Sequence, residues 1–269
     1  MEKKVVLITG GSSGIGKSIG LYLKEEGFKI YGTTRSLLKN SEFEGFELLE
    51  LDVTHPDSIA FAVKSLLDRE GRIDVLVNNA GVGITGPIEE TPHEEILKVF
   101  DTNVHGPIHM AKAVLPQMRR QNFGHIINIT SIAGYMGLPY RGVYSATKAA
   151  LATLTEALRM EVKNFGVEIT TLAPGDFATN IAAGRYHVPI YEDSPYKEPY
   201  GNTLKMINED VDGGDDPILV AKEVLKVINT KSPKVHYKVG APMQKFSTRL
   251  KKILPDKVFE KLLLNHYKL

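Results

Sequence analysis

Tyr144 and Lys148 are four residues apart in a stretch with helical periodicity, which predicts both side chains on one face of a helix. A lysine ammonium beside a phenol favours the phenolate, so this tyrosine could donate a proton to a substrate oxygen or accept one from it. Ser131 follows a short apolar run, and its hydroxyl could hydrogen-bond an oxygen on which charge develops. A tyrosine alone on a helix is usually a packing residue, but these three side chains together predict acid–base chemistry at a carbonyl or hydroxyl group.

A glycine-rich segment near the N-terminus has the pattern of a phosphate-binding turn. Residues 5–16 read VVLITGGSSGIG, which predicts a strand, a tight turn and the start of a helix. Gly10 permits the turn, Gly14 lets the backbone approach a phosphate, and Gly16 lets the helix pack closely on the strand. Exposed N–H groups and the helix dipole there favour a pyrophosphate. The spacing Gly-x-x-x-Gly-x-Gly is neither the commoner dinucleotide fingerprint nor a P-loop, and an ordinary glycine-rich turn is the alternative interpretation.

The scaffold for these residues is predicted by short apolar runs that alternate with amphipathic stretches of helical length. The runs lie at residues 5–9, 29–33, 47–51, 75–78, 125–130 and 168–173. The helical stretches lie at residues 16–26, 57–69, 94–120 and 145–164. The runs show little polar alternation, as expected of strands buried on both faces. We therefore predict an α/β protein with a Rossmann-type doubly wound parallel sheet, helices on both faces and a single domain over residues 1–269.

The start of the long helix at residues 94–120 has its own signal. Thr91, Pro92 and Glu94 match the N-cap, the first position and the third position of a capping box. We therefore expect the Thr91 side chain to cap this helix.

The alternation ends after Gly175. Residues 180–216 are rich in proline and tyrosine and are expected to form a loop-like excursion that acts as a lid. A helix at 217–230 and a last strand at 235–239 follow, and the tail at 243–269 is basic and amphipathic. Four apolar residues of the tail form one stripe at helical spacing: Val258, Phe259, Leu262 and Leu263. We expect this stripe to pack on the core or on a partner subunit, with contact to a membrane surface as the alternative.

Composition excludes several classes of protein. The 269 residues include 33 Lys and Arg against 32 Asp and Glu, a net charge of +1, and no cysteine. The lack of cysteine excludes a disulfide scaffold, a zinc–thiolate site and a cysteine nucleophile. The balanced charge gives no overall attraction to nucleic acid, and no apolar run approaches the roughly 18 residues of a membrane span. His105 and His109 lack a carboxylate partner motif, so no metal is expected. We also expect a soluble, cytoplasmic protein.

Five motifs, in order along residues 4 to 240, resemble those of the short-chain dehydrogenase/reductase family in its single-domain form. They are TGxxxGIG at 9–16, Asp52-Val53, Asn78-Asn79-Ala80-Gly81, Tyr144-x-x-x-Lys148 with Asn103 and Ser131, and Pro174-Gly175 with Thr179. The resemblance implies a Rossmann fold and hydride transfer between a nicotinamide dinucleotide and a carbonyl or alcohol substrate. The long tail is similar to that of the hydroxysteroid and retinol dehydrogenase branches.

The resemblance also implies a role for each matching residue. The catalytic residues would be Asn103, Ser131, Tyr144 and Lys148, with Asn103 holding a water that relays protons to the lysine. The dinucleotide would contact residues from all five motifs and from the end of the second strand: Gly10, Ser12, Ser13, Gly14, Ile15, Gly16, Thr34, Arg35, Asp52, Val53, Asn79, Ala80, Gly81, Tyr144, Lys148, Pro174, Gly175 and Thr179.

The end of the second strand favours NADP(H) over NAD(H) as the cofactor. Residues 29–39 contain no carboxylate that could bind an unphosphorylated adenosine ribose. Thr34 stands where NAD-linked relatives commonly carry Asp, and Arg35 follows it, as in NADP-linked relatives. Arg35 offers a forked pair of donors to a 2′-phosphate, with hydroxyls from Ser12, Thr34 or Ser36. The alternative is that Arg35 stacks on adenine or faces solvent, which leaves NAD(H) possible.

Other functions and the choice of substrate are less constrained. A non-catalytic dinucleotide-binding regulator would lack tetrad residues, and all four are present. A sugar-nucleotide epimerase usually has a larger C-terminal substrate domain than this chain can hold. Residues 83–88, 135–141 and 177–202 are predicted to line the pocket, and their Tyr and Leu content favours a small-molecule carbonyl or alcohol substrate of apolar or aromatic character. We expect a homodimer or homotetramer.

Overall fold

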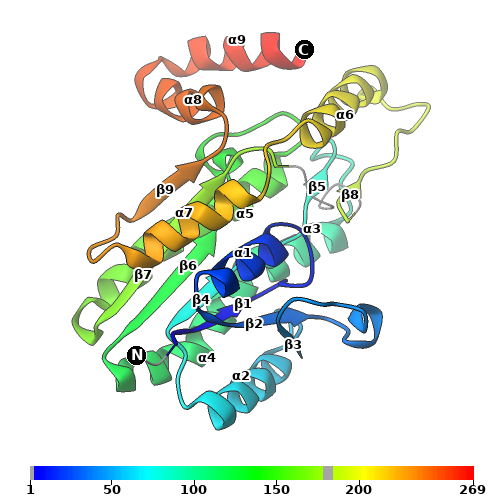
Figure 1. The fold of residues 1–269 in the computed structure, drawn as a ribbon. Helices are drawn as coiled ribbons and strands as arrows, with labels where there is room; N and C mark the ends of the chain where they lie inside the picture. Colours follow the sequence, from blue (N-terminus) through cyan, green and yellow to red (C-terminus); the bar gives the residue numbers. More distant parts are fainter. Residues whose placement is uncertain (1–2, 178–183) are drawn as a thin grey trace.

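Seven parallel strands form the central sheet of the computed structural model, which describes residues 3–177 and 184–269 (Figure 1). The strand order is β3-β2-β1-β4-β6-β7-β9. The strands are β1 (Val5–Ile8), β2 (Lys29–Thr34), β3 (Glu47–Glu50), β4 (Val75–Asn78), β6 (Gly124–Ile129), β7 (Val167–Pro174) and β9 (His236–Val239). Each coincides with a predicted strand to within one residue at either end.

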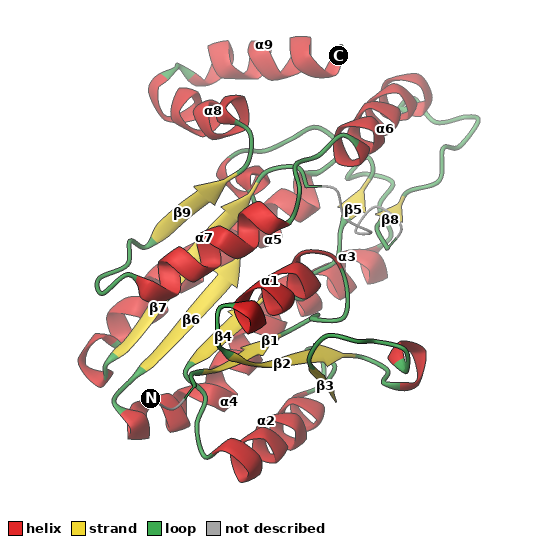
Figure 2. Cartoon of the chain, in the orientation of Figure 1, coloured by secondary structure: helices red, strands yellow, loops and turns green. Residues whose placement is uncertain are grey.

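Helices cover both faces of this sheet (Figure 2), which confirms the predicted fold class. One face packs against α1 (Gly14–Glu25) and α7 (Ile218–Asn229), and the other against α2 (Pro56–Glu70), α4 (Gly106–Gln121) and α5 (Gly142–Glu161). Alternate side chains of β1 separate into the two cores. Val5 and Leu7 lie in one core, and Val6 and Ile8 lie in the other. A strand of this kind must be apolar at every position, which explains its continuous apolar sequence.

The order of the strands reverses at β1. The chain moves outward from β1 through β2 to β3, then returns to place β4 on the other side of β1. The loops after β1 and β4 therefore diverge, and a crevice opens between them at the carboxyl edge of the sheet. The glycine-rich turn, residues 9–13, lies in this crevice.

The long helix predicted at residues 94–120 is present but contains an irregular turn. It consists of α3 (His93–Phe100), a π-helical turn (Asp101–His105) and α4. The prediction that Thr91 caps it is wrong. Pro92 is the N-cap residue, and the Thr91 hydroxyl donates to the carbonyl oxygen of Pro87 at 2.7 Å. The Thr91 hydroxyl is thus held by the turn that precedes the helix.

The segment at 180–216 contains regular structure that its composition did not predict. Residues Lys197–Asp212 form α6, and Tyr186–His187 form β8, which pairs with β5 (Ile84–Thr85). Pro199 lies in the first turn of α6, where a missing N–H removes no intrahelical bond. The Tyr200 side chain is buried, and its hydroxyl donates to the carbonyl oxygens of Thr85 (3.1 Å) and Val188 (3.0 Å). The lid function of this segment stays a prediction.

The C-terminal tail forms two helices, α8 (Pro242–Ile253) and α9 (Asp256–Tyr267), beyond the carboxyl edge of the sheet (Figure 1). Phe259 is buried against Ile132 and Met136, so the tail packs on the core as predicted. The proposed stripe is only partly buried, because Val258 and Leu262 are 47% and 46% exposed. None of the helices in the described residues has the length and apolarity that a bilayer span requires.

Candidate active site

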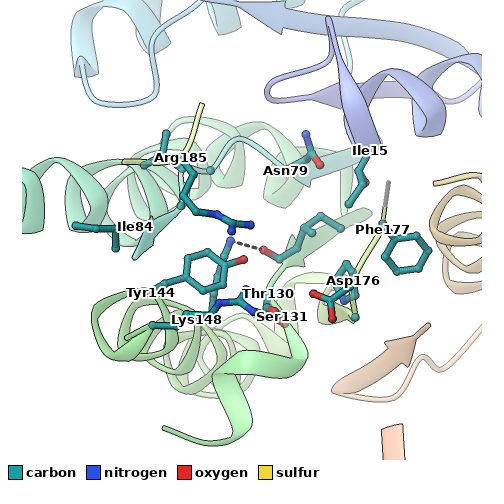
Figure 3. Close-up of a pocket in the computed structure, with 17 residues that line it drawn as sticks. Ile15, Asn79, Ile84, Thr130, Ser131, Tyr144, Lys148, Asp176, Phe177 and Arg185 are labelled. Atoms are coloured by element: carbon teal, nitrogen blue, oxygen red, sulfur yellow. Dashed lines mark hydrogen bonds between the residues drawn. The ribbon is translucent and has the colours of Figure 1, made fainter. Parts of the chain in front are cut away.

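A pocket opens at the carboxyl edge of the sheet (Figure 3). Its walls come from the start of α1, the segments after β4, β6 and β7, and the first turns of α5. The lining residues are Ile15, Asn79, Gly81, Val82, Gly83, Ile84, Ile129, Thr130, Ser131, Arg141, Tyr144, Lys148, Pro174, Gly175, Asp176, Phe177 and Arg185. Parallel strands end together at this edge, so residues from distant parts of the sequence converge here.

Tyr144 and Lys148 project from the same face of α5, as their spacing predicts. The Lys148 side chain is buried, and its Nζ donates to the carbonyl oxygen of Ile129 at 3.1 Å. The same Nζ lies 5.8 Å from the centroid of the Tyr144 ring. A buried ammonium fixed in this way places a positive charge beside the phenol.

Ser131 lies two residues beyond the end of β6 and is the N-cap residue of a short 3₁₀ helix, Ile132–Tyr135. Its Oγ accepts a hydrogen bond from the Ala133 N–H at 3.1 Å. Because the Ser131 oxygen acts here as an acceptor, its own proton is available to a ligand oxygen in the pocket. Ser131 and Tyr144 can therefore both donate to one substrate oxygen.

Asn103 is fully buried in the π-helical turn. Its Oδ1 accepts from the Val82 N–H (2.9 Å), and its Nδ2 donates to the Val82 carbonyl oxygen (2.9 Å) and to Thr147 Oγ1 (3.1 Å). The side chain thus ties the segment after β4 to α5. A Cβ at Gly81 would lie 3.2 Å from Asn103 Oδ1 and 3.3 Å from Lys148 Nζ, so this segment passes very close to both catalytic candidates.

The glycine-rich turn has the geometry of a phosphate cradle. Gly10 and Gly14 have φ values of 64° and 51°, in the region that favours glycine. A Cβ at Gly16 would overlap the carbonyl oxygen of Gly10. The N-cap residue of α1 is Ser13, whose side chain makes no capping hydrogen bond. The first N–H groups of α1 therefore remain available to an anion.

Asn79 and Ala80 join the cradle to the end of β4. The Asn79 Nδ2 donates to the carbonyl oxygens of Thr9 (3.0 Å) and Gly10 (3.2 Å). The N–H groups of Asn79 and Ala80 both donate to Thr9 Oγ1 at 3.0 Å. The Asn79 side chain therefore braces the glycine-rich turn, and its neighbours line the crevice.

The end of the crevice predicted to hold the adenosine is bounded by Asp52 and by the segment after β2. Burial would raise the pKa of the Asp52 carboxyl, but hydrogen bonds from the Thr54 N–H and hydroxyl outweigh it and lower the pKa. The charge of Arg35 acts in the same direction, and the Arg35 side chain is exposed. Thr34 Oγ1 accepts from Asn40 Nδ2 at 2.9 Å and donates to the Ser36 carbonyl oxygen. Thr34 therefore orders the loop, and Arg35 is free to meet a ligand.

The end of the pocket predicted to hold the nicotinamide is formed by Pro174, the last residue of β7, and by Gly175. The Gly175 N–H donates to the carbonyl oxygen of Val239 at 2.9 Å. Gln244, on α8, accepts from the Asp176 N–H at 3.2 Å and donates to the Asp176 carboxylate at 2.6 Å. A Cβ at Gly175 would overlap the Gln244 side chain. Thr179, predicted to contact the carboxamide, lies outside the described residues.

Two polar residues beside the pocket lie outside the segments predicted to line it: Asp176, and Gln244, which is hydrogen-bonded to Asp176. Arg141 and Arg185 lie in segments predicted to line the pocket. Gln244 lies in the tail, and no sequence pattern connects it to β7.

These features fit a nicotinamide dinucleotide. The α1 N-terminus and the glycine-rich turn would hold the pyrophosphate, Asp52 and Val53 would lie at the adenine, and the tetrad would face the nicotinamide. The bound nicotinamide would supply or accept a hydride at the pocket.

The chain belongs to the short-chain dehydrogenase/reductase family, because the family model for short chain dehydrogenases matches residues 4–187. It is therefore an oxidoreductase of the class that acts on CH–OH and C=O groups.

Two curated relatives illustrate this membership. The chain is 38% identical to a 3-ketodihydrosphingosine reductase from Bacteroides thetaiotaomicron, over 97% of this chain and 96% of that protein. It is 33% identical to 17-beta-hydroxysteroid dehydrogenase type 1 from Mus musculus, over 88% and 74% of the respective chains. These relatives support a position near the hydroxysteroid dehydrogenase-like branch.

Solved structures agree with the fold and with dinucleotide binding. A short-chain dehydrogenase from Streptomyces avermitilis has a TM-score of 0.82 at 32% identity and covers 100% of this chain and 97% of its own. An alcohol dehydrogenase from Thermococcus sibiricus complexed with 5-hydroxy-NADP has a TM-score of 0.73 at 25% identity, covering 90% and 97%. A Burkholderia phymatum relative in complex with NAD has a TM-score of 0.80 at 25% identity, covering 93% of each chain. A nicotinamide dinucleotide cofactor is thus supported, in either form.

Proposed function

We propose that this protein is an NADP(H)-dependent oxidoreductase that interconverts a ketone and a secondary alcohol on an apolar substrate, with Tyr144 as the acid/base. The observation that carries the proposal is the convergence of the Tyr144 phenol, the Ser131 hydroxyl and the buried Lys148 ammonium on one pocket. The relative that reduces 3-ketodihydrosphingosine supports a ketone on a long apolar chain. Val82, Ile84 and Phe177 supply apolar wall for such a chain.

In the reduction, negative charge develops on the carbonyl oxygen of the substrate, and the protein must stabilise that charge. Ser131 donates a hydrogen bond to that oxygen, and Tyr144 transfers its proton to it. The Lys148 charge stabilises the phenolate that remains on Tyr144. In the oxidation the same phenolate removes the hydroxyl proton, so one arrangement serves both directions.

Arg35 supports the choice of NADP(H). It is exposed directly after β2, on the side of the crevice where Asp52 lies, and residues 29–39 hold no carboxylate that would repel a 2′-phosphate. A planar guanidinium can donate two parallel hydrogen bonds to a phosphate. Ser12, in the glycine-rich turn, adds a hydroxyl.

Steady-state kinetics with a panel of ketones, including 3-ketodihydrosphingosine, test this proposal. NADPH should support reduction better than NADH. Arg35→Ala should raise the KM for NADPH about 10- to 150-fold, the value of a charge-assisted hydrogen bond, and change NADH little. Lys39→Ala, which removes another exposed charge of the same loop, is the matched control. Thr34→Asp should shift preference further towards NADH. If the wild-type protein used NADH as well as it uses NADPH, it would instead be an NAD(H)-linked enzyme.

The quaternary structure and cell compartment are part of the proposal. We propose a cytoplasmic homodimer or homotetramer. Light scattering on the purified protein gives its mass, and a monomeric mass would contradict the assembly.

A further inference from the structure

Arg185 is a buried cation in the pocket that the reaction described above does not use. It lies between the pocket and β8, and its side chain is only 9% exposed. Its Nη1 is buried with no hydrogen-bond partner among residues 3–177 and 184–269. Figure 3 shows the guanidinium pointing into the pocket beside Tyr144. A buried charge without a partner is costly, so its retention here needs a reason.

The backbone around Arg185 holds this side chain in place. The Tyr186 N–H donates to the Gly83 carbonyl oxygen at 3.1 Å, where β8 pairs with β5. A Cβ at Gly83 would lie 2.9 Å from Arg185 Cγ and 3.1 Å from its Nε. Only a glycine at position 83 leaves room for the arginine stem, so the pocket wall is shaped around it.

The charges that face Arg185 do not neutralise it. Burial lowers the pKa of the Arg185 guanidinium, and the neighbouring charge of Arg141 lowers it further. Tyr144 and Asp176 act in the opposite direction. Asp176 is the single carboxylate among the described residues that line the pocket, and it is already hydrogen-bonded to Gln244. The lining thus holds three cationic side chains, Arg141, Lys148 and Arg185, and one carboxylate, so the pocket carries an excess of positive charge.

We propose that Arg185 determines substrate specificity by binding a carboxylate or phosphate group that lies close to the reacting ketone. This inference rests on the proposed function, because it names the substrate class of the same site. The guanidinium fork can donate two hydrogen bonds to either group, and Arg141 adds a second positive charge. The matching substrate is a 3-oxo acid, or a 2-oxo phosphonate, with an apolar chain beyond the ketone.

Matched pairs of substrates test the proposal and separate the two anions. The measured quantity is the rate of NADPH consumption. One pair compares 3-oxodecanoate with its methyl ester, and the other compares 2-oxononylphosphonate with its dimethyl ester. Arg185→Ala should lower kcat/KM for the preferred anion about 10- to 150-fold and leave its ester within about 3-fold. Arg185→Lys keeps the charge without the fork and should recover part of the loss. Arg120→Ala, on the exposed end of α4, is the control for removal of an arginine.

The kinetic pattern also separates this role from two others. If Arg185→Ala lowered kcat/KM equally for the anion and its ester and shifted the pH profile of kcat, Arg185 would act on Tyr144. A selective rise in the KM for NADPH would show that it binds the cofactor. Either result would overturn the proposal.

A binding measurement keeps the inference independent of turnover. Calorimetric titration of the full chain, with NADP⁺ present, should show tighter binding of octanoate or octylphosphonate than of methyl octanoate, and Arg185→Gln should abolish the difference. Equal affinities in the wild type would overturn the anion site whatever the enzyme reduces. Selective anion binding without reduction of any ketone would instead count against the proposed function alone.

Discussion

The two sides of the pocket are built in different ways. On the cofactor side, β1, the glycine-rich turn and the end of β4 lie in close contact, braced by the Asn79 side chain, and Gly10 and Gly16 serve by having no side chain. On the substrate side, side chains join segments that are far apart in sequence. Tyr200 reaches Thr85 across 115 residues, and Tyr196 donates to Glu89 across 107. The cofactor side therefore tolerates almost no substitution, whereas the substrate side can be altered one contact at a time.

Replacing Tyr144 by Phe, where the two sides meet, should have the largest effect. The ring still packs, but the proton donor is lost, so kcat should fall about 10²- to 10⁴-fold. Affinity for NADPH, measured by fluorescence titration, should stay within about 3-fold because the cradle is untouched. More than about a tenth of wild-type turnover would contradict the assigned role.

Gly16→Ala should damage the cofactor side alone. The new Cβ would press on the Gly10 carbonyl oxygen and on the Asn79 side chain, which brace the turn. Overpacking of this kind costs about 1–3 kcal/mol, so the Kd for NADPH should rise about 5- to 150-fold. Gly137→Ala is the matched control, since a Cβ at Gly137 meets no atom within 4 Å. Equal effects of the two substitutions would refute the contrast between the two sides.

His125 lies on β6, away from the pocket, and should affect stability without affecting turnover. Burial, with the charges of Arg159 and Lys4, lowers its pKa from 6.5 to about 4. The folded state therefore binds fewer protons than the unfolded state, and the stability is present above pH 6.5 and lost as the pH falls towards 4. Urea unfolding should show a loss of about 2 kcal/mol from this group between pH 7 and pH 5. His125→Gln should remove this pH dependence, and an unchanged slope would contradict it.

Gln244→Ala should have the smallest effect, because it removes one long-range contact, at the end of the pocket where the nicotinamide would lie. Loss of its bonds to Asp176 frees the segment after β7, and kcat/KM should fall about 2- to 10-fold, mainly through the KM for NADPH. Gln117→Ala removes a comparable bond, to the Gly71 carbonyl oxygen, far from the pocket. The control should lower the free energy of unfolding but leave the kinetics unchanged.

This contrast also explains which features were predictable from sequence. The strands were predicted because a buried parallel strand must be apolar throughout, and the shared helix face of Tyr144 and Lys148 because they are related by one helical turn. Asn103 was identified only through the resemblance to the family. The helix α6 was missed because Pro199 and the tyrosines suggest a loop, while one of the partners that hold Tyr200, Thr85, is 115 residues away. The capping box failed for a related reason, since the Thr91 hydroxyl is held by the Pro87 carbonyl oxygen of the preceding turn. Arg185 and Gln244 acquire their roles only when β8 and α8 reach the pocket.

The contact between α8 and β7 has a consequence for protein engineering. Recombining the substrate-binding half with that of a relative would usually place the crossover points on either side of the excursion, after β7 and before α7. Gln244 would then face a foreign residue at position 176, and any residue other than glycine at position 175 would overlap it. A chimera should therefore take α8 and the segment after β7 from the same parent protein.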